Sequence, residues 1–233
     1  MAFHEELREG WSGVVATGAW FASLPEALQG FLLQAAQLRT LTAGQRLFAR
    51  GEAPDGVYCL VSGAVRIGGL TAAGQEALLV VLEPPQWFGE IALFDREPRT
   101  HDAWAEADSA LAHVPQDALQ RLLLEQPLYW QHFGRLLTQK LRMVFTGLED
   151  TALLPPTPRV ARRLANIATG YGAWSDRSKR VLTVSQKQLG LMLSLSRQTV
   201  NQSLGELEAA GAIRRTRGAI EIIDLAKLSD PHE

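Results

Sequence analysis

The sequence predicts an α+β chain with three parts: a jelly-roll-like β domain, a long helix, and a smaller module of helices with a β-hairpin. Two observations predict it. From residue 38 to residue 114, short β-rich runs alternate with Gly or Pro turns, as in a barrel or sandwich. Beyond the prolines near residue 155, short capped helices precede a basic β-rich stretch. The expected parts are residues 1–126, 127–154 and 155–233.

The composition is that of an ordinary globular protein. Of 233 residues, 46% are apolar and 21% are charged, and the formal net charge is -2. The single cysteine, Cys59, excludes an internal disulfide, a four-Cys zinc site and an all-Cys iron–sulfur cluster, and favours a reducing, cytoplasmic setting. The N-terminus has no basic region before an apolar core, so no signal peptide is expected. No apolar run approaches the ~20 residues of a membrane span, so no membrane partner is expected.

Charge is divided unevenly along the chain. Residues 1–150 hold 11 basic and 18 acidic residues, whereas residues 151–233 hold 12 basic and 7 acidic. This division favours two modules with different partners, with chance asymmetry as the alternative. The change coincides with prolines at 155, 156 and 158, which end a preceding helix. We expect Thr157 to cap the next helix, with Pro158 at its first position.

Helical patterns flank the β-rich region. They cover residues 24–37, residues 116–124 and a long stretch over residues 128–152. In the long stretch an apolar residue recurs at the spacing of a two-helix seam, so we expect a homodimer interface there. Packing of this stripe on the β domain is the alternative. The stripe consists of Leu137, Leu141, Val144 and Leu148.

The stretch over residues 88–100 has the chemistry of an anion site. Gly89 permits close approach of the backbone to a ligand, and residues 89–93 are expected to form a helical turn whose N–H groups face a phosphate. Arg99 offers a fork of donors to phosphate oxygens, and Glu90 can accept from a sugar hydroxyl. A surface salt bridge between Glu90 and Arg99 is the alternative. The candidate ligand residues are Gly89, Glu90, Ile91, Ala92, Arg99 and Thr100.

A second pattern, over residues 183–213, predicts a helix-turn-helix. Ser185 and Gln188 have the spacing of a capping box, and Ser196 can cap a second helix. The second helix presents side chains that read base edges, because Arg suits guanine and Gln or Asn suits adenine. A generic helix pair is the alternative. The presented side chains are Arg197, Gln198, Asn201 and Gln202.

Residues 213–220 are expected to form a basic β-hairpin. It carries Arg215 and Arg217, which are suited to phosphate contacts. The hairpin extends the predicted helix-turn-helix into a winged form.

The turns at glycines 44, 51 and 63 and the segment GEIALFDREPRT resemble the cyclic-nucleotide-binding β-roll and its phosphate-binding cassette. With the predicted winged helix-turn-helix, the chain resembles the cyclic-AMP receptor/fumarate-nitrate-type (CRP/FNR) transcription regulators. The resemblance implies a homodimer that binds a twofold-symmetric site in double-stranded DNA and acts through RNA polymerase. The resemblance implies that the protein requires no cofactor. It also implies that the effector is a cyclic nucleotide, with cyclic AMP as the first candidate.

The resemblance also implies residue roles. Glu90 would take the ribose hydroxyl and Arg99 the cyclic phosphate. Val144 and Phe145 occupy positions where cyclic-AMP responders place hydroxyl residues against adenine, so an apolar pair can stack on a base but loses hydrogen-bond recognition. In the DNA module, Arg197, Gln198 and Gln202 occupy the base-reading positions, and Thr199 lies near the DNA backbone. The remaining DNA-binding candidates are Ser185, Asn201, Arg215 and Arg217.

Other functions stay open at this point. One is constitutive DNA binding with a vestigial pocket or a different effector, and another is a cyclic-nucleotide module that regulates a protein partner. A third is an enzyme that uses Glu90 and His101 as an acid/base pair, but no nucleophile–base–orienter set is visible and we expect no catalysis. A haem sensor would need His101, His113 or His132 as an axial ligand, and we expect no metal.

Overall fold

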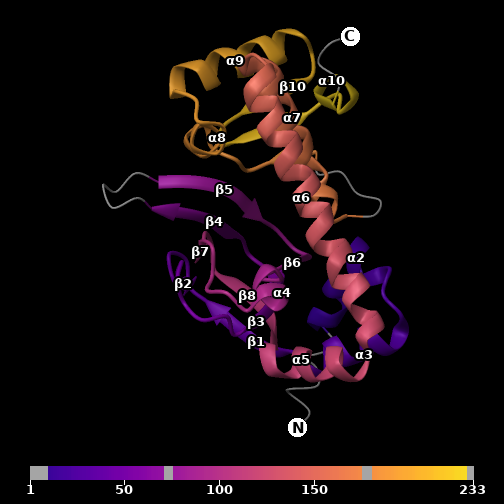
Figure 1. Cartoon of the computed structure of the whole chain (residues 1–233). Coiled ribbons are helices and arrows are strands. Elements are labelled where there is room, and N and C mark those ends of the chain that lie inside the picture. The colour runs from indigo at the N-terminus through magenta and orange to yellow at the C-terminus, as the bar shows by residue number, and fades with distance from the viewer. Residues whose placement is uncertain (1–9, 71–75, 175–179, 230–233) are drawn as a thin grey trace.

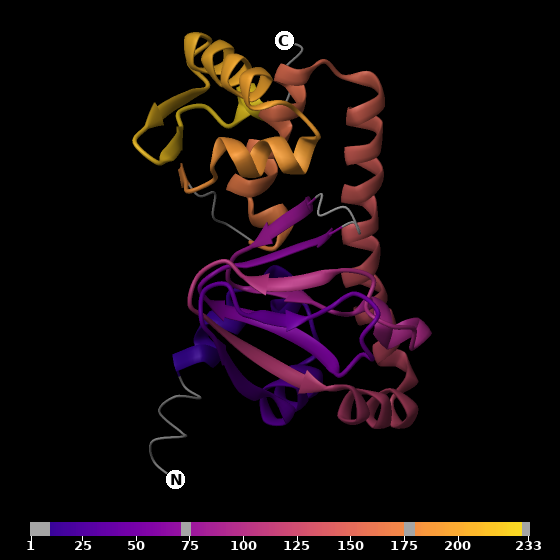
Figure 2. The same cartoon turned by 90° about the vertical axis from the view of Figure 1, so that its left-hand side faces the viewer.

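The computed structural model of the chain describes residues 10–70, 76–174 and 180–229. A β domain lies at one end and a helical C-terminal module at the other, and one long helix runs beside both (Figures 1 and 2). Residues 1–9, on which the signal-peptide expectation depends, lie outside the described residues. Within the described ranges, no helix has the length and apolarity that a membrane span requires.

The β domain consists of two four-stranded antiparallel sheets, which confirms the jelly-roll-like prediction. One sheet has the strand order β1-β8-β3-β6 and the other β2-β7-β4-β5. The strands are β1 (Gln37–Leu41), β2 (Arg46–Phe48), β3 (Gly56–Ser62), β4 (Val65–Leu70), β5 (Glu76–Leu82), β6 (Gln86–Phe88), β7 (Asp102–Ala105) and β8 (Ser109–Pro115).

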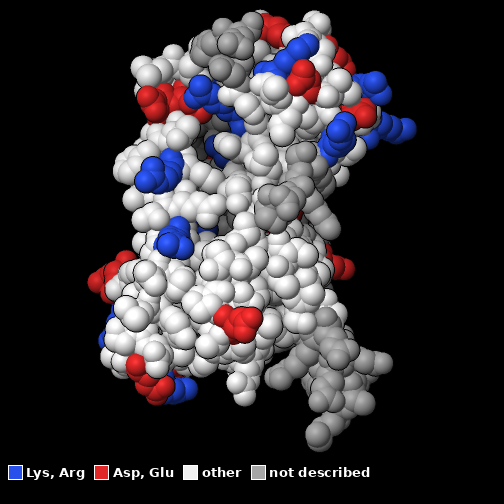
Figure 3. Space-filling model, turned by 90° about the vertical axis from the view of Figure 1, so that its right-hand side faces the viewer, with Lys and Arg blue, Asp and Glu red and all other residues white. Residues whose placement is uncertain are grey.

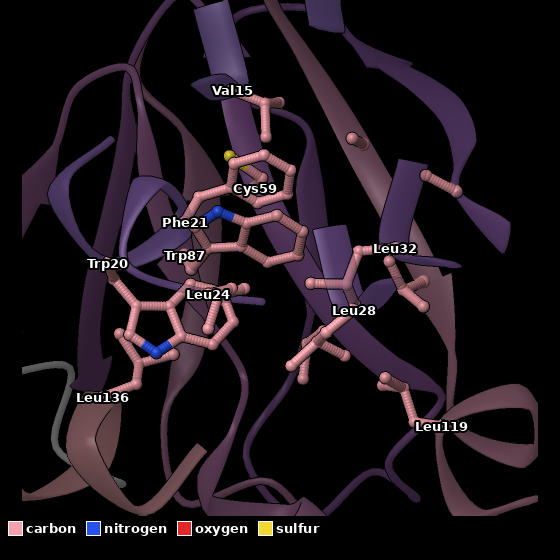
Figure 4. Close-up of a cluster of buried hydrophobic side chains, with 14 of the residues drawn as sticks. Val15, Trp20, Phe21, Leu24, Leu28, Leu32, Cys59, Trp87, Leu119 and Leu136 are labelled. Carbon is pink, nitrogen blue, oxygen red and sulfur yellow. The ribbon is translucent and has the colours of Figure 1, made fainter. Parts of the chain in front are cut away.

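Strand β3 separates two cores, because successive side chains of a strand point to opposite faces. Tyr58 and Leu60 pack in the interior between the two sheets. Val57, Cys59 and Val61 pack on the other side, beneath helices. Figure 4 shows this helix-covered cluster, in which Phe21 and Trp87 lie beside Cys59. Burial raises the pKa of the Cys59 thiol, so it packs as a small apolar group.

The predicted helices around the β domain are confirmed. Trp20 anchors the N-terminal segment, since its indole N–H donates to the carbonyl of His132 at 2.8 Å. Phe133 and Leu136 of the long helix are buried in the same cluster. The helices are α2 (Ala19–Ala22), α3 (Glu26–Ala35), α4 (Ile91–Asp95), α5 (Gln116–Glu125), the 3-10 turn η1 (Pro127–Tyr129) and the 24-residue α6 (Trp130–Leu153).

The predicted cap after the hinge is wrong. Helix α7 (Pro156–Ala168) has Pro155 as its N-cap and Pro156 at its first position, where a missing N–H costs nothing. The Thr157 hydroxyl is instead bonded to side chains of the C-terminal module, Ser203 at 3.1 Å and Glu206 at 2.6 Å.

Both helix starts of the predicted helix-turn-helix are confirmed. The Ser185 hydroxyl accepts from the Gln188 N–H at 3.1 Å, and the Ser196 hydroxyl accepts from the Thr199 N–H at 3.1 Å. Gly190 is required by the tight turn, because a Cβ there would lie 2.8 Å from the carbonyl oxygen of Leu195. The helices are α8 (Gln186–Leu193) and α9 (Arg197–Ala209).

A small antiparallel sheet completes the C-terminal module, in the order β10-β11-β9, and its β10–β11 hairpin is the predicted wing. Val200, Leu204 and Leu207 of α9 point into the module's own core, as predicted. The remaining elements are η2 (Gly170–Gly172), β9 (Val181–Leu182), β10 (Ile213–Thr216), β11 (Ala219–Ile222) and α10 (Ala226–Ser229).

The separate cores predict that the two modules can be destabilised independently. Leu204→Ala removes a fully buried side chain and should cost about 2–5 kcal/mol of unfolding free energy in the C-terminal module. Five of the six tryptophans precede residue 150, so urea unfolding followed by tryptophan fluorescence reports mainly on the β domain. In Leu204→Ala, part of the circular-dichroism signal, which includes the helices of both modules, should be lost at lower urea while the fluorescence transition stays. In Leu28→Ala, the fluorescence transition should move to lower urea while part of the circular-dichroism signal stays at the wild-type midpoint. A shift of both signals in full in each variant would contradict independent cores.

Candidate functional site

The sequence predicts a helical turn at residues 89–93, and the structure has it two residues later, as α4 (Ile91–Asp95). Gly89 has φ of 91°, and a Cβ there would lie 2.9 Å from Nη1 of Arg99, so only glycine fits. Glu90 is the N-cap of α4. Ala92 is buried and its carbonyl accepts from the Gln116 side chain, whereas Ile91 lies at the surface.

Arg99 is held beneath this turn and is 5% exposed. Its Nη2 donates to the Asp55 carboxylate at 2.8 Å and to the Gly56 carbonyl at 2.7 Å, and its Nη1 donates to the Gly89 carbonyl at 3.0 Å. The guanidinium carbon also lies 4.5 Å from the ring centroid of Phe48. Its Nε is buried and has no hydrogen-bond partner among the described residues, which is uncommon for a buried donor.

Asp55 is the counter-charge of Arg99, and the sequence patterns gave it no role. The Tyr58 hydroxyl donates to its carboxylate at 2.6 Å, and Arg39 adds an ion pair at 3.0 Å. Burial raises the pKa of Asp55, but the hydrogen bonds from Tyr58 and Arg99 outweigh burial and hold the pKa below its usual value. Asp55 is therefore ionised at neutral pH and orients Arg99.

Glu90 pairs with a residue of the long helix that the sequence analysis missed. The Glu90 carboxylate is 2% exposed and accepts from Nζ of Lys140 at 2.7 Å. The same ammonium donates to the Trp87 carbonyl at 2.7 Å. The alternative of a surface salt bridge between Glu90 and Arg99 is wrong, since both side chains are buried and each is bonded to other groups.

The other predicted ligand residues lie at the surface. Thr100 is exposed, and its hydroxyl lies 2.9 Å from Nδ1 of His101. Val144 and Phe145 follow Lys140 by about one turn of α6 and are 56% and 61% exposed. The chain thus brings Glu90, Arg99 and Lys140 to one turn, and leaves the predicted base-contacting pair on an open helix face.

The predicted dimer stripe lies on that open face. Leu141 and Leu148 are exposed, as is Val144, and Leu137 is partly buried nearer the β domain. The alternative that the whole stripe packs on the β domain is therefore wrong for its exposed members.

The predicted base-reading residues gather at the start of α9. Arg197, Gln198 and Asn201 line an open hollow of about 550 Å³ together with Gln186 of α8. The Asn201 side-chain oxygen accepts from Gln186 at 3.3 Å, which joins the two helices. The exposed Gln202 donates from its amide to Glu206 at 3.1 Å.

The wing is attached to the same helix. Arg215 donates from Nη1 to Asn201 at 3.2 Å and from Nε to Glu208 at 2.7 Å, whereas Arg217 is exposed at the hairpin turn. The Thr199 hydroxyl lies 2.8 Å from the Ser196 hydroxyl, at the same end of α9. Figure 3 shows Lys and Arg gathered mainly over the C-terminal module on the face it presents.

The described residues give no support to a metal or acid/base site. They contain no group of three or more His, Cys, Asp or Glu placed to hold a metal ion. Among the haem candidates, His113 is buried beside Asp55 and His132 is buried under Trp20, so each belongs to a packed cluster. Glu90 is bonded to Lys140 and His101 to Thr100, so the imagined pair is not formed.

Comparison with known proteins agrees with this arrangement. The family model of the cyclic nucleotide-binding domain matches residues 38–126, and that of the Crp-like helix-turn-helix domain matches residues 158–230. The chain is 30% identical over 187 residues to the CRP-like cAMP-activated global transcriptional regulator of Mycobacterium tuberculosis, covering 80% of this chain and 84% of the relative. It is 27% identical over 195 residues to the cyclic AMP receptor protein of Thermus thermophilus, covering 83% and 87%.

The fold is also that of a solved relative. FixK2 from Bradyrhizobium japonicum superposes with a TM-score of 0.73 at 19% identity, covering 84% of this chain and 96% of that chain. Membership of one family therefore explains the order of the domains, the cassette turn at residues 89–95 and the capped helices α8 and α9. The chain belongs to the CRP/FNR family of transcription regulators, in which a cyclic nucleotide-binding domain is joined to a DNA-binding helix-turn-helix domain.

Proposed function

We propose that this regulator binds a cyclic nucleotide at the cassette turn, with cyclic AMP as the first candidate effector. The observation that carries the proposal is the buried Arg99, which Asp55 orients and whose Nε has no partner among the described residues. Arg99 is bonded to the carbonyl of Gly89, the residue that precedes the buried Glu90. A buried cationic donor suits a phosphate, and a buried carboxylate suits ribose hydroxyls. The names of the Mycobacterium and Thermus relatives support this effector class.

The ligand would bind beside Lys140. The ammonium of Lys140 donates to Oε2 of Glu90 at 2.7 Å, and a ribose hydroxyl that binds this same oxygen competes with the ammonium for it. Lys140 lies on α6, which continues to the hinge, so the ligand alters a contact between the cassette and the helix that leads to the DNA module. Only a ligand that favours the DNA-competent arrangement over the present one gives allosteric control.

A second candidate function is constitutive DNA binding, or control by a different effector. Val144 and Phe145 favour it, because these exposed apolar side chains can stack on a base but donate no hydrogen bond to it. Absence of binding by cyclic AMP, cyclic GMP and cyclic di-GMP, with DNA binding retained, would favour this candidate.

The proposed target is double-stranded DNA with twofold symmetry, bound by a homodimer. An unpartnered apolar stripe on α6, made of Leu141, Val144 and Leu148, supports the dimer because apolar heptad positions pair with a second helix. Arg197, Gln198 and Gln202 are proposed to read bases, with Ser185, Thr199 and Arg217 at phosphates. Asn201 and Arg215 are exposed on the same surface, and their side chains are bonded to each other at 3.2 Å, which joins the wing to α9. As for relatives in the family, we place its action in the cytoplasm, through RNA polymerase and without a catalytic step.

Arg99→Ala tests the effector site. Cyclic AMP binding, measured by isothermal titration calorimetry, should weaken at least about 10-fold, since even one hydrogen bond to a charged phosphate is worth about 1.5–3 kcal/mol. The exposed Arg96→Ala is the matched control and should titrate as the wild type does. Because Arg99→Ala also removes one of the two arginines paired with Asp55, Thr100→Val provides a second test and should weaken binding by about 2–10-fold. If cyclic AMP binding is unchanged in both Arg99→Ala and Thr100→Val, the proposed effector site is refuted.

Arg197→Ala tests the DNA surface. It should cost about 1–3 kcal/mol at one base pair of each half-site and relax the preference there, because a bidentate contact to guanine is lost. Selection of duplexes from a random pool by the wild type and the variant, at one salt concentration, measures this. Arg214→Ala, on the wing and paired with Glu221, is the control. Equal weakening on every sequence would instead assign Arg197 to a phosphate.

A further inference from the structure

Residues 170–174, at the end of α7, contact the β domain at several separate elements. We call them the docking loop. Its Trp174 also forms a β-bridge with Gly18 of the N-terminal segment. The bonds are from Trp174 Nε1 to the Pro84 carbonyl (3.1 Å), from Gln86 Nε2 to the Gly170 carbonyl (3.0 Å), from Gln139 Nε2 to the Gly172 carbonyl (3.2 Å) and from the Ala19 N–H to the Ala173 carbonyl (2.9 Å).

The docking loop has a strained backbone at Tyr171, and the contacts of the loop with the β domain offset this strain. Gly170, Tyr171 and Gly172 all have left-handed φ, of 59°, 54° and 76°. Tyrosine rarely adopts that region, and its cost must be offset by the surrounding contacts. A Cβ at Gly170 would also lie 2.5 Å from the Trp174 ring, so the loop is built to place that indole against the β domain.

Two partners of the docking loop adjoin the proposed ligand site. Gln86 directly precedes Trp87, and Gln139 directly precedes Lys140. Lys140 joins those two segments, because its ammonium donates to the Trp87 carbonyl and to Glu90. A ligand that separates Glu90 from Lys140 therefore disturbs the two segments that hold the docking loop, β6 through Gln86 and α6 through Gln139.

The docked arrangement places the β domain against the first helix of the helix-turn-helix. Helix α8 packs on β5, as the two views in Figures 1 and 2 agree, and Arg163 of α7 donates to the Leu79 carbonyl at 3.3 Å. The Gln188 amide, in the first turn of α8, donates to the carboxylate of Glu106 at 3.1 Å. The start of a helix favours phosphate, so Glu106 presents a like charge where a DNA phosphate would approach.

We propose that the docking loop holds the helix-turn-helix module in an arrangement of low DNA affinity, and that ligand binding at Glu90 weakens this hold. The weakening of the hold by ligand rests on the proposed function. The hold itself concerns the ligand-free chain alone. Removal of the hold should therefore raise the DNA affinity of the protein without any effector.

The test is the full-length double variant Trp174→Phe with Gln86→Leu, which removes two bonds of the docking loop and keeps apolar bulk. The control is Trp130→Phe with Gln29→Leu, whose partners are the ring of Phe94 in α4 and the carbonyl of Leu24. Hydrogen exchange of the Ala19 amide reports docking directly, since this N–H donates to the loop. Affinity is measured by fluorescence anisotropy on a duplex selected by the wild type from a random pool, with and without cyclic AMP.

In the loop variant, the Ala19 amide should exchange faster, and ligand-free DNA affinity should rise at least about fivefold, the lower end of typical allosteric coupling. The control should match the wild type in both. A separate variant, Glu106→Gln, should also tighten ligand-free binding. Unchanged or weaker DNA affinity in the loop variant overturns the proposal, whether or not the amide is released.

The cyclic AMP arm separates this inference from the proposed function. If the wild type responds to cyclic AMP, the response of the loop variant should fall below about twofold, because it already occupies the released arrangement. A wild type that does not respond refutes the proposed effector, while the ligand-free comparison still decides the role of the loop.

Discussion

The ion pair between Glu90 and Lys140 is the contact on which the architecture depends. A buried carboxylate is stable only when it is paired and hydrogen-bonded, and Glu90 has little contact with water. Its cation comes from α6 and not from the β domain itself. The cassette and the long helix are therefore joined through a buried charge, and under the proposed function this is the carboxylate that the ligand hydroxyl reaches.

Helix α6 extends this contact toward the DNA-binding module. Its 24 residues span about 36 Å without proline. At its end, Asp150 forms an ion pair with Arg162 of α7, across a hinge of two extended residues. The side of α6 that carries Leu141 and Val144 remains open. One helix thus contacts the ligand turn and leads to the DNA module, and it still offers a face to a second copy.

The features that sequence predicted best depend on neighbours a few residues apart. Ser185 with Gln188, and Ser196 with Thr199, form caps over three residues, and Gly89 is required by a local turn. Such interactions need no knowledge of the tertiary fold. The strand and turn pattern predicts a barrel or sandwich, and the resemblance of the glycine turns and of GEIALFDREPRT to a known family specifies the β-roll.

The features that sequence missed join distant segments. Asp55 lies 44 positions from Arg99, Glu90 lies 50 from Lys140, and Pro84 lies 90 from Trp174. Each pairing depends on sheet register and on how helices dock, which local patterns do not determine. The prediction that Thr157 caps α7 was wrong for the same reason, since its hydroxyl is bonded to side chains of α9, which is distant in sequence.

The central claim is that ligand binding at the cassette controls DNA binding by the helix-turn-helix. The most direct test is the affinity of the full-length protein for its selected duplex with and without saturating cyclic AMP, at one salt concentration. We predict about 5–150-fold tighter binding with the nucleotide, and equal affinity in both conditions would contradict the claim.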